Sequence, residues 1–235
     1  MPELPEHGSP KAARILAAAG ELLLSRGCKG FTVADVATRA HVGKGTVYLY
    51  WKTKEELLVG LIGRDFLGLA DDVTARVTAD PDLARPSRLC SDMLRVGAEH
   101  PFVRALQHGD DDLLGVLAED PRSVRLLDTL GPEGVMRAIL PVWRANGLAR
   151  ADWPLEDQVL ALQALTTGFI ALSANPANRR SPAELERVFA ESVTALLGPE
   201  RATARQLQAT VTDGLAYLAK ARATALDLIT QSAAA

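Results

Sequence analysis

Apolar residues recur along most of this chain at the three- and four-residue spacing that places them on one face of a helix. No run alternates apolar and polar residues with strand-forming composition. The pattern therefore predicts an all-α fold. The first helix is expected to begin at Pro10, with Ser9 as its N-cap, because proline is favoured at the first helical position. Gly27 is expected to end it.

The next helices carry their own start signals. Thr32, with Asp35 three residues later, makes a capping-box pattern, and Thr53 with Glu56 makes a second one. Between them, the glycine-bearing turn at residues 41–43 leads into another short helix. The predicted helices run from Val33 to about Ala40, from Lys44 to Tyr50, and from Lys54 towards Ala79.

Beyond residue 80, prolines and glycines divide the apolar pattern into further helices. These are predicted at Leu83–His100, Pro101–Gln107, Asp111–Ala118, Arg122–Asn146, Leu155–Ala174, Pro182–Leu197 and from about Arg201 to Gln231. Gly131-Pro132 would interrupt the segment 122–146, so two helices there are an alternative. The Ala-rich end, residues 232–235, is the one low-complexity tract.

Composition places the chain among ordinary globular proteins: of 235 residues, 48% are hydrophobic and 23% charged. No uninterrupted apolar run reaches eighteen residues, so no membrane span is expected. The first nine residues lack the basic and apolar regions of a secretory signal, which predicts a cytoplasmic protein. Cys28 and Cys90 are too few for a disulfide framework or a zinc site and are interpreted as reduced thiols.

Charge is distributed unevenly. Residues 10–54 hold eight Lys and Arg against two Asp and Glu, a net charge of +6, whereas the whole chain carries −3, so the remainder sums to −9. A basic head on an acidic body is typical of a protein whose head binds phosphate. Chance clustering of solvated lysines is the alternative. We predict a flexible leader at residues 1–9, a DNA-binding domain at 10–56 and a helical ligand-binding and dimerisation domain at 57–235.

The segment GFTVADVATRAHVGKGTVYLYW, residues 30–51, has the anatomy of a helix-turn-helix. The small Ala37 allows the two helices to approach closely, Val42 and Val47 fill the angle between them, and the second helix is presented outward, as in proteins that read the major groove. The run VGKGTVYLYWKTKEELL, residues 42–58, resembles the signature of the TetR family of bacterial transcriptional regulators. Gly43 stands where that family commonly has serine. The resemblance covers residues from about 10 to 60 and implies an all-helical regulatory domain after them.

The chemistry of the matching positions suggests how each would meet DNA. Thr32 would offer a hydroxyl to phosphate, and Lys54 would meet phosphate at the start of the long helix. Lys44 and Thr46 would lie nearest the base edges, and Gly45 would permit close backbone approach. Tyr48 and Tyr50 would flank the groove, unless they pack against the first helix. Val47 and Trp51 are assigned to the core.

One short recognition helix buries too little surface for specific affinity, so a homodimer on a two-fold operator is expected. The predicted interface is the helix pair 155–174 and 182–197, the four-helix arrangement that the resemblance implies; packing of both helices inside the monomer is the alternative. The candidate interface residues are Leu162, Leu165, Phe169, Leu185, Phe189 and Leu196. The long helix 201–231 could extend the dimer or wrap a pocket.

An unidentified small-molecule effector is expected to bind inside the helices from Lys54 to Asn146 and to tilt the long helix, so that ligand and operator compete. Aromatic residues are scarce, which makes those of the body candidates for the pocket, with a methionine as a deformable neighbour; core packing is the alternative for each. The candidates are Phe66, Met93, Phe102, Trp143 and Phe169.

Other classes of protein are less consistent with the sequence. It shows no nucleophile motif, no glycine-rich phosphate loop and no His-Glu-x-x-His, so no enzyme activity and no cofactor are predicted. His100 and His108 are separated by helix breakers, which argues against a metal site. A purely structural bundle would have no reason to present Lys44 and Tyr48 outward. We therefore predict a repressor released by its effector, with an activator and a ligand-blind regulator as open alternatives.

Overall fold

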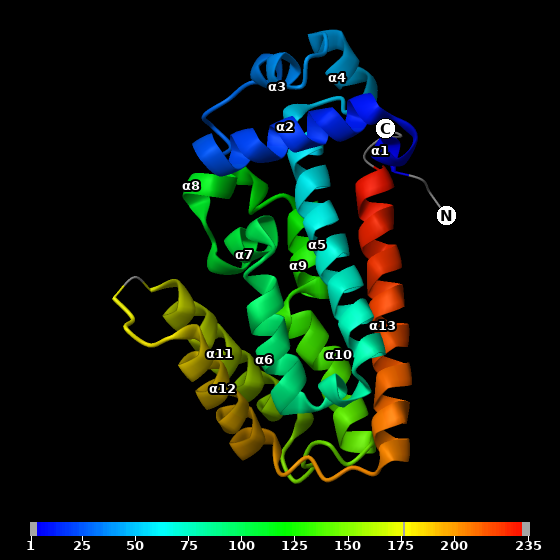
Figure 1. Cartoon of the computed structure of the whole chain (residues 1–235), viewed down its shortest axis with the longest axis vertical. Coiled ribbons are helices and arrows are strands. Elements are labelled where there is room, and N and C mark those ends of the chain that lie inside the picture. Colours follow the sequence, from blue (N-terminus) through cyan, green and yellow to red (C-terminus); the bar gives the residue numbers. More distant parts are fainter. Residues whose placement is uncertain (1–3, 176, 232–235) are drawn as a thin grey trace. The chain divides into compact units, whose positions relative to one another are not determined.

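A computed structural model describes residues 4–175 and 177–231; the predicted Ala-rich end and the first three residues of the predicted leader lie outside this range. Every regular element in these residues is a helix and none is a strand, which confirms the all-α prediction (Figure 1). None of the helices described is both long and apolar enough to cross a membrane. The chain forms two compact units, and α5, α9 and α13 each contribute residues to both.

The first unit comprises Met1–Leu67, Pro101–Leu127 and the chain from Arg222 onward. The helical elements that lie entirely within it are α1 (Pro5–Gly8), α2 (Pro10–Arg26), α3 (Val33–Arg39), α4 (Lys44–Tyr50), α7 (Pro101–His108), α8 (Asp111–Leu114) and the 3-10 turn η2 (Gly115–Leu117). It also holds the first part of α5 (Lys54–Ala79), most of α9 (Pro121–Leu130) and the end of α13 (Ala204–Gln231).

Local capping explains why the N-terminal helices begin where predicted. The Ser9 hydroxyl accepts a hydrogen bond from the amide of Ala12, and Thr32 and Asp35 make both bonds of the predicted capping box. At α5 the pattern is only half realised. Thr53 Oγ1 accepts from the amide of Glu56, but the Glu56 carboxylate accepts from the amide of Lys52 instead of that of Thr53.

The segment predicted as a leader includes the helical turn α1. Leu4 is buried, and the Glu6 carboxylate receives two hydrogen bonds from the Arg64 guanidinium, at 2.5 and 2.7 Å. Burial alone would raise the pKa of Glu6, but the hydrogen bonds and charge of Arg64 outweigh it and leave the pKa lowered. Residues 4–8 are therefore packed onto α5.

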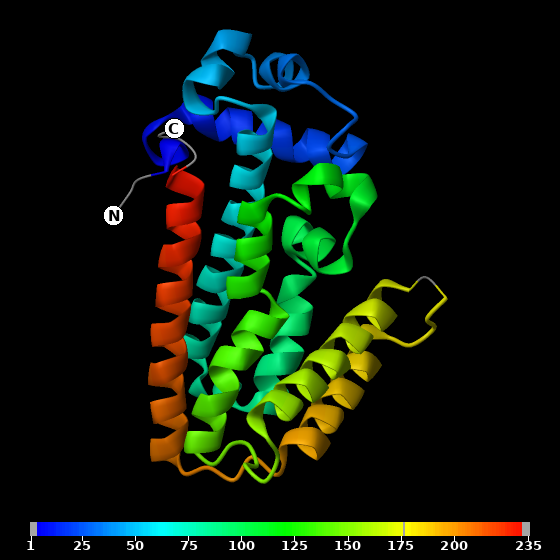
Figure 2. The same ribbon diagram turned by 180° about the vertical axis from the view of Figure 1, so that it is seen from behind.

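The second unit comprises Gly68–His100 and Asp128–Ala221. Its complete elements are η1 (Pro81–Ala84), α6 (Pro86–Gly97), α10 (Pro132–Ala145), α11 (Leu155–Ala174) and α12 (Pro182–Leu197). α11 and α12 lie side by side as a pair, and α12 also packs on α6 (Figures 1 and 2).

Two proline positions decide how the later segments divide. Pro86 separates η1 from α6, so the single helix predicted over 83–100 is two elements. Pro132 begins α10 after an extended Gly131, so the two-helix alternative for 122–146 is correct. In both places the residue before proline is extended, because the proline ring disfavours a helical conformation there. The predicted helices 155–174 and 182–197 match α11 and α12 residue for residue.

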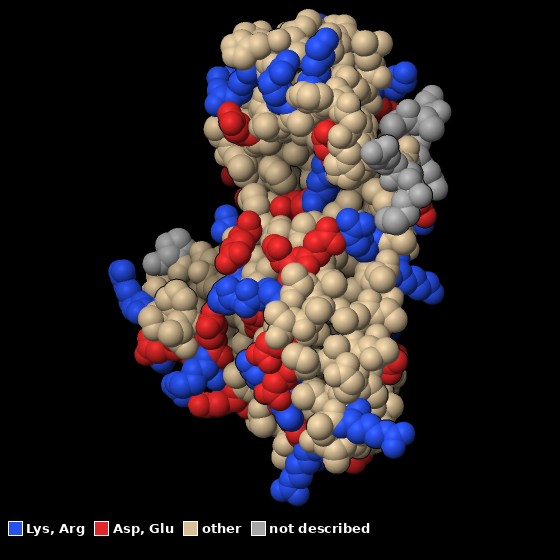
Figure 3. All heavy atoms as spheres, turned by 45° about the vertical axis from the view of Figure 1, so that its right-hand side comes forward, with Lys and Arg blue, Asp and Glu red and all other residues tan. Residues whose placement is uncertain are grey.

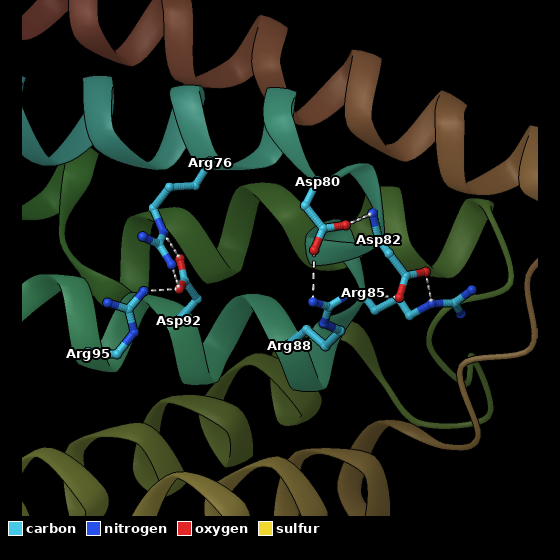
Figure 4. Close-up of polar contacts among 7 residues, drawn as sticks. All are labelled: Arg76, Asp80, Asp82, Arg85, Arg88, Asp92 and Arg95. Atoms are coloured by element: carbon cyan, nitrogen blue, oxygen red, sulfur yellow. Dashed lines mark hydrogen bonds and ion pairs between the residues drawn. The ribbon is translucent and has the colours of Figure 1, made fainter. Parts of the chain in front are cut away.

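Ion pairs bind α5 to α6 inside the second unit (Figure 4). The carboxylate of Asp92, 7% exposed, accepts hydrogen bonds from Arg76 at 2.5 and 2.7 Å and from Arg95 at 2.5 Å. Arg88 bridges Asp80 and Asp82 at 2.8 Å each. Burial would raise the pKa of Asp92, but the two guanidinium groups outweigh it and the pKa is lowered.

We expect Asp92→Asn to destabilise the protein by about 1–3 kcal/mol at neutral pH, because two arginines lose a charged acceptor. A carboxylate whose pKa is lowered by folding contributes stability above its unfolded pKa, and this contribution disappears as the pH falls through the folded pKa. The stability difference from the parent should therefore shrink below about pH 4. Urea unfolding between pH 3 and pH 8 measures it. Equal stability of variant and parent throughout would contradict the assignment, and Asp152→Asn, in the exposed pair with Arg150, should change little.

Candidate nucleic-acid interface

α3 and α4 form a helix-turn-helix whose inner face is closed (Figure 1). Val36 and Ala37 of α3 and Val47 of α4 are buried, and Trp51 after α4 is buried as well, which confirms the core assignments of Val47 and Trp51. In the turn, His41 adopts a left-handed conformation with φ of 53°, and the amide of Val42 donates to the carbonyl of Ala37 at 2.9 Å. Histidine is among the residues that tolerate this conformation best.

The outer face of α4 is solvent-exposed along its length. Lys44 and Gly45 are exposed, Thr46 is half-buried, and Tyr48 is 39% exposed. The ammonium of Lys44 lies 5.8 Å from the centroid of the Tyr48 ring, so these two side chains share one patch. The structure thus brings together the residues that were expected to meet base edges.

Leu49 stands where the TetR family frequently has histidine and was not among the predicted DNA contacts. Its side chain is 77% exposed on α4, more than that of any other large apolar residue in the part of the chain described. A single exposed leucine is unremarkable on a protein surface, but this one stands on the face that carries Tyr48. The helical spacing contained the signal: Leu49 lies two residues after the buried Val47 and two before Trp51, so it cannot share their face.

The hydroxyl of Thr32 is engaged in hydrogen bonds within the protein. Its hydroxyl donates to Asp35 Oδ2 at 2.7 Å and accepts from the Asp35 amide at 3.3 Å. These hydrogen bonds from Thr32 lower the pKa of Asp35, which therefore carries a negative charge close to the hydroxyl. A phosphate at this position would meet both groups, so the structure favours Thr32 as a cap more than as a phosphate donor.

Tyr50 makes the contact with the first helix that was considered as the alternative to a position at the groove. It is half-buried, and its hydroxyl lies 2.6 Å from that of Ser9, the N-cap of α2. The ring also contacts Trp51, with a centroid distance of 5.6 Å. Tyr50 therefore ties the end of α4 to the beginning of α2.

Lys54 makes internal contacts at the start of α5. Its ammonium donates to the carbonyls of Cys28 and Phe31 at 2.5 Å each and lies 4.1 Å from the centroid of the Phe31 ring. Those carbonyls belong to the loop between α2 and α3, which the lysine holds against the start of α5. Because two of its donors point into the protein, Lys54 has a structural role that the sequence did not predict, and its contact with phosphate stays a prediction.

Basic side chains gather on the helix-turn-helix end of the face drawn in Figure 3. Part of the charge counted from the sequence is used internally: Arg39 pairs with Glu21 at 2.5 Å, and Arg14 donates to the carbonyl of Ala40. Lys11 and Lys52 are exposed, as is Lys44. The unit keeps a positive surface that can hold a polyanion.

Comparison with known proteins agrees with this geometry. Residues 15–61 match the profile described as "Bacterial regulatory proteins, tetR family", which spans α2, α3, α4 and the beginning of α5. The match therefore concerns the N-terminal part of the chain, about a fifth of its length, and ends before the second unit begins.

Two curated relatives come from Bacillus subtilis. The "Fatty acid metabolism regulator protein" is 34% identical over 79 residues, which are 32% of this chain and 41% of that protein. The "Uncharacterized HTH-type transcriptional regulator YvdT" is 28% identical over 79 residues, 34% of this chain and 41% of that protein. The similarity thus spans less than half the length of either relative.

Two solved structures extend the likeness over most of the length of this chain. A putative TetR-family regulator from Shewanella sp. PV-4 superposes with a TM-score of 0.56 and 19% identity, covering 81% of this chain and 100% of that one. FadR of Thermus thermophilus, a TetR-family transcriptional repressor solved with lauroyl-CoA, superposes with a TM-score of 0.50 and 25% identity, covering 82% and 98%. The first likeness concerns the fold alone.

The five residues predicted to line a ligand pocket do not converge. Phe66 and Phe102 are buried in the first unit, whereas Trp143 is buried in the second and donates its indole N–H to the carbonyl of Ala84 at 2.9 Å. Phe169 packs on Phe189, with ring centroids 4.8 Å apart. Met93 alone of the five lines an apolar cavity of the second unit, described below. No group of three or more potential metal ligands occurs in the residues described.

The predicted dimer residues divide by exposure. Leu162, Leu185 and Phe189 are buried inside the second unit, which places them in its core and not on its surface. Leu165, Phe169 and Leu196 are half-buried. The exposed apolar positions of α11 are instead Leu160, at 64%, and Leu172, at 46%. α11 therefore presents apolar residues both inward and outward.

Proposed function

We propose that this protein is a transcriptional repressor that binds a two-fold symmetric operator as a homodimer and is released by a small-molecule effector. The observation that carries the proposal is the outward face of α4, where Lys44, Tyr48 and Leu49 are exposed on a helix held by a closed core. A helix of this kind fits the major groove. The family of the N-terminal domain supports the same reading.

Base recognition in this proposal rests on α4. Lys44 donates to guanine acceptors, the half-buried Thr46 offers a methyl or a hydroxyl, and Gly45 leaves open space for the DNA backbone. Tyr48 reaches bases or sugar at the edge of the groove. Tyr50 holds α4 against α2, and the exposed lysines of the unit bind phosphate.

Leu49 should read thymine methyl groups, since an exposed leucine on this face has no polar atom to offer a base. Replacing one contacted thymine in each half-site by deoxyuridine removes only the methyl group. We expect the affinity of the parent to fall about three- to tenfold, which is the scale of one buried methylene per half-site. The affinity of Leu49→Ala should not respond to the same replacement. Fluorescence anisotropy measures the affinity of the parent and of Leu49→Ala for the thymine and the deoxyuridine operator. If the two changes have additive effects on the binding free energy, Leu49 does not contact the methyl group.

The dimer is proposed to form through the outward face of α11, with α12 beside it. Leu160, Ala164, Gly168 and Leu172 follow one another at four-residue spacing, and all four are exposed. Such a stripe of large and small apolar residues suits a closely packed, self-complementary helix interface. The half-buried Leu196 of α12 adds to the rim of this face.

The effector is proposed to be an acyl-CoA. Two relatives support this class: one is a fatty acid metabolism regulator, and the other is a repressor solved with lauroyl-CoA. α5 supplies residues to both units. A ligand that alters the position of α5 in the second unit therefore acts on a helix whose first part belongs to the first unit. Binding of ligand and operator would then oppose each other by reciprocal coupling.

The proposal is tested by selecting the preferred site of the purified full-length protein from random duplex DNA, then measuring affinity at about 0.1 M salt with competitor DNA, since affinity depends steeply on salt. A two-fold symmetric site, bound far more tightly than unrelated DNA and released by lauroyl-CoA, is expected. Sequence-independent binding alone would overturn the repressor function. A specific complex that is indifferent to acyl-CoA would overturn only the effector.

A further inference from the structure

An apolar cavity of about 30 Å³ lies within the second unit, between α5, η1, α6, α10 and α13. Six of its thirteen lining residues come from α13: Thr210, Val211, Gly214, Leu215, Tyr217 and Leu218. The sequence analysis left the role of this helix undecided. Its contribution makes α13 the largest single part of the cavity wall.

The cavity presents hydrocarbon only. None of its lining residues is charged, and the two side-chain hydroxyls among them are bonded elsewhere. Thr210 Oγ1 donates to the carbonyl of Gln206 at 3.0 Å, and the Tyr217 hydroxyl donates to the carbonyl of Thr129 at 2.7 Å. A charged or hydrogen-bonding ligand group would be desolvated there without a partner. The space therefore suits an alkyl chain.

The segment that leads into α13 is anchored by several hydrogen bonds, whereas two leucines of α13 at the cavity are half-buried. Before α13, Glu200 adopts a positive φ of 44°, accepts hydrogen bonds from Ser87 on both carboxylate oxygens, at 2.6 and 3.1 Å, and accepts one from Arg85 on its carbonyl. A strained residue of this kind persists only when its surroundings hold it. Further along the helix, by contrast, Leu215 and Leu218 are only half-buried.

Gly214 is the position of α13 that faces Ile139 of α10. It has no side chain, and a Cβ built on it would lie 3.5 Å from Ile139 Cδ1, an ordinary contact distance. Met93, unbranched and flexible, lines the same space. A void of this size holds about one water molecule, far less than a ligand needs. An alkyl chain must therefore widen the cavity, and α13 between Gly214 and Leu218 forms the largest part of the wall that could move.

We infer that α13 is the movable wall of the effector site and that the alkyl chain of the effector enters between Gly214 and Ile139. The inference rests on the proposed function, which supplies the effector; the cavity supplies the chemical class of its buried part. The polar remainder of the effector stays outside, because the lining offers it no partner.

Calorimetry with the full-length protein tests the chain-binding step directly. The probes are octanoyl-CoA, lauroyl-CoA, lauric acid and CoA alone. Affinity should rise with chain length, by up to about fourfold per methylene, and CoA alone should not bind. Lauric acid separates a free fatty acid from its thioester as the source of the chain. Binding of CoA as tight as that of lauroyl-CoA would overturn the inference.

Two leucine substitutions on α13 give a matched pair. Ala216→Leu adds a leucine at an exposed position that does not line the cavity and should bind lauroyl-CoA as the parent does. Gly214→Leu fills the cavity and should weaken lauroyl-CoA binding at least tenfold. If Gly214→Leu does not fold, Ile139→Phe fills the space from the opposite wall and carries the same expectation.

The outcomes separate this inference from the proposed function. A Gly214→Leu protein that folds and still binds lauroyl-CoA like the parent would overturn the role of α13 even if the operator complex forms and responds to ligand. Absence of any specific operator complex would overturn the repressor function, while calorimetry on the same proteins would still decide where the chain binds.

Discussion

A protein carrying Lys44→Ala and Tyr48→Ala should lose specific operator affinity by about a hundredfold or more, since each good base contact contributes about 1–3 kcal/mol. Both side chains are exposed on α4 and neither belongs to the core, so the variant should fold like the parent. Anisotropy with the selected operator measures the loss. The weak affinity for unrelated DNA should fall much less, because the other exposed lysines remain.

Arg187→Ala is the control for loss of positive charge, because Arg187 is exposed in the second unit and pairs with Glu191. It should leave the operator affinity near that of the parent. If the double variant binds the operator as tightly as this control, α4 is not the recognition helix. A uniform loss on all DNAs would instead assign Lys44 and Tyr48 to phosphate contacts.

Placing arginine at Leu160 and Leu172 should convert the dimer into a monomer at micromolar concentration. The two positions are exposed at the ends of the α11 stripe, and in a two-fold interface each substitution occurs twice, which brings like charges into an apolar contact. A monomer binds one half-site, so we expect operator affinity to fall by about a hundredfold or more. Sedimentation velocity and anisotropy measure the two effects.

Val124→Arg provides the matched control, because Val124 is another exposed large apolar residue but lies on α9. It should remain dimeric. A parent protein that is already monomeric at these concentrations would contradict the proposed assembly. Dimers that persist in the α11 variant would assign the interface to another surface.

The sequence could predict the N-terminal helices closely because their boundaries are set by neighbouring residues. The caps at Ser9 and Thr32 satisfy helix amides within three residues, so their effect needs no knowledge of the tertiary fold. The same reasoning located the outward face of α4. It did not place Leu49 among the DNA contacts, because a leucine side chain offers a base no hydrogen bond.

Tertiary contacts decided what could not be predicted. Lys54 begins a helix, a position typical of phosphate binding, and its internal role was not predicted because the carbonyls of Cys28 and Phe31 come within reach only in the folded unit. α11 is apolar around its whole circumference, so its sequence could not tell which leucines face inward. Aromatic residues suggested a pocket, yet Phe66 and Trp143 fill the core, and the space remains beside Gly214.

The inward position of Lys54 has a consequence for chemical footprinting. Its ammonium is held by two carbonyls and the face of Phe31, so an acylating reagent must wait for the loop between α2 and α3 to open. Lys44 and Lys52 are exposed and should be modified rapidly. The slow modification of Lys54, followed by mass spectrometry, would then act as a clock for local opening of the helix-turn-helix, readable with and without DNA.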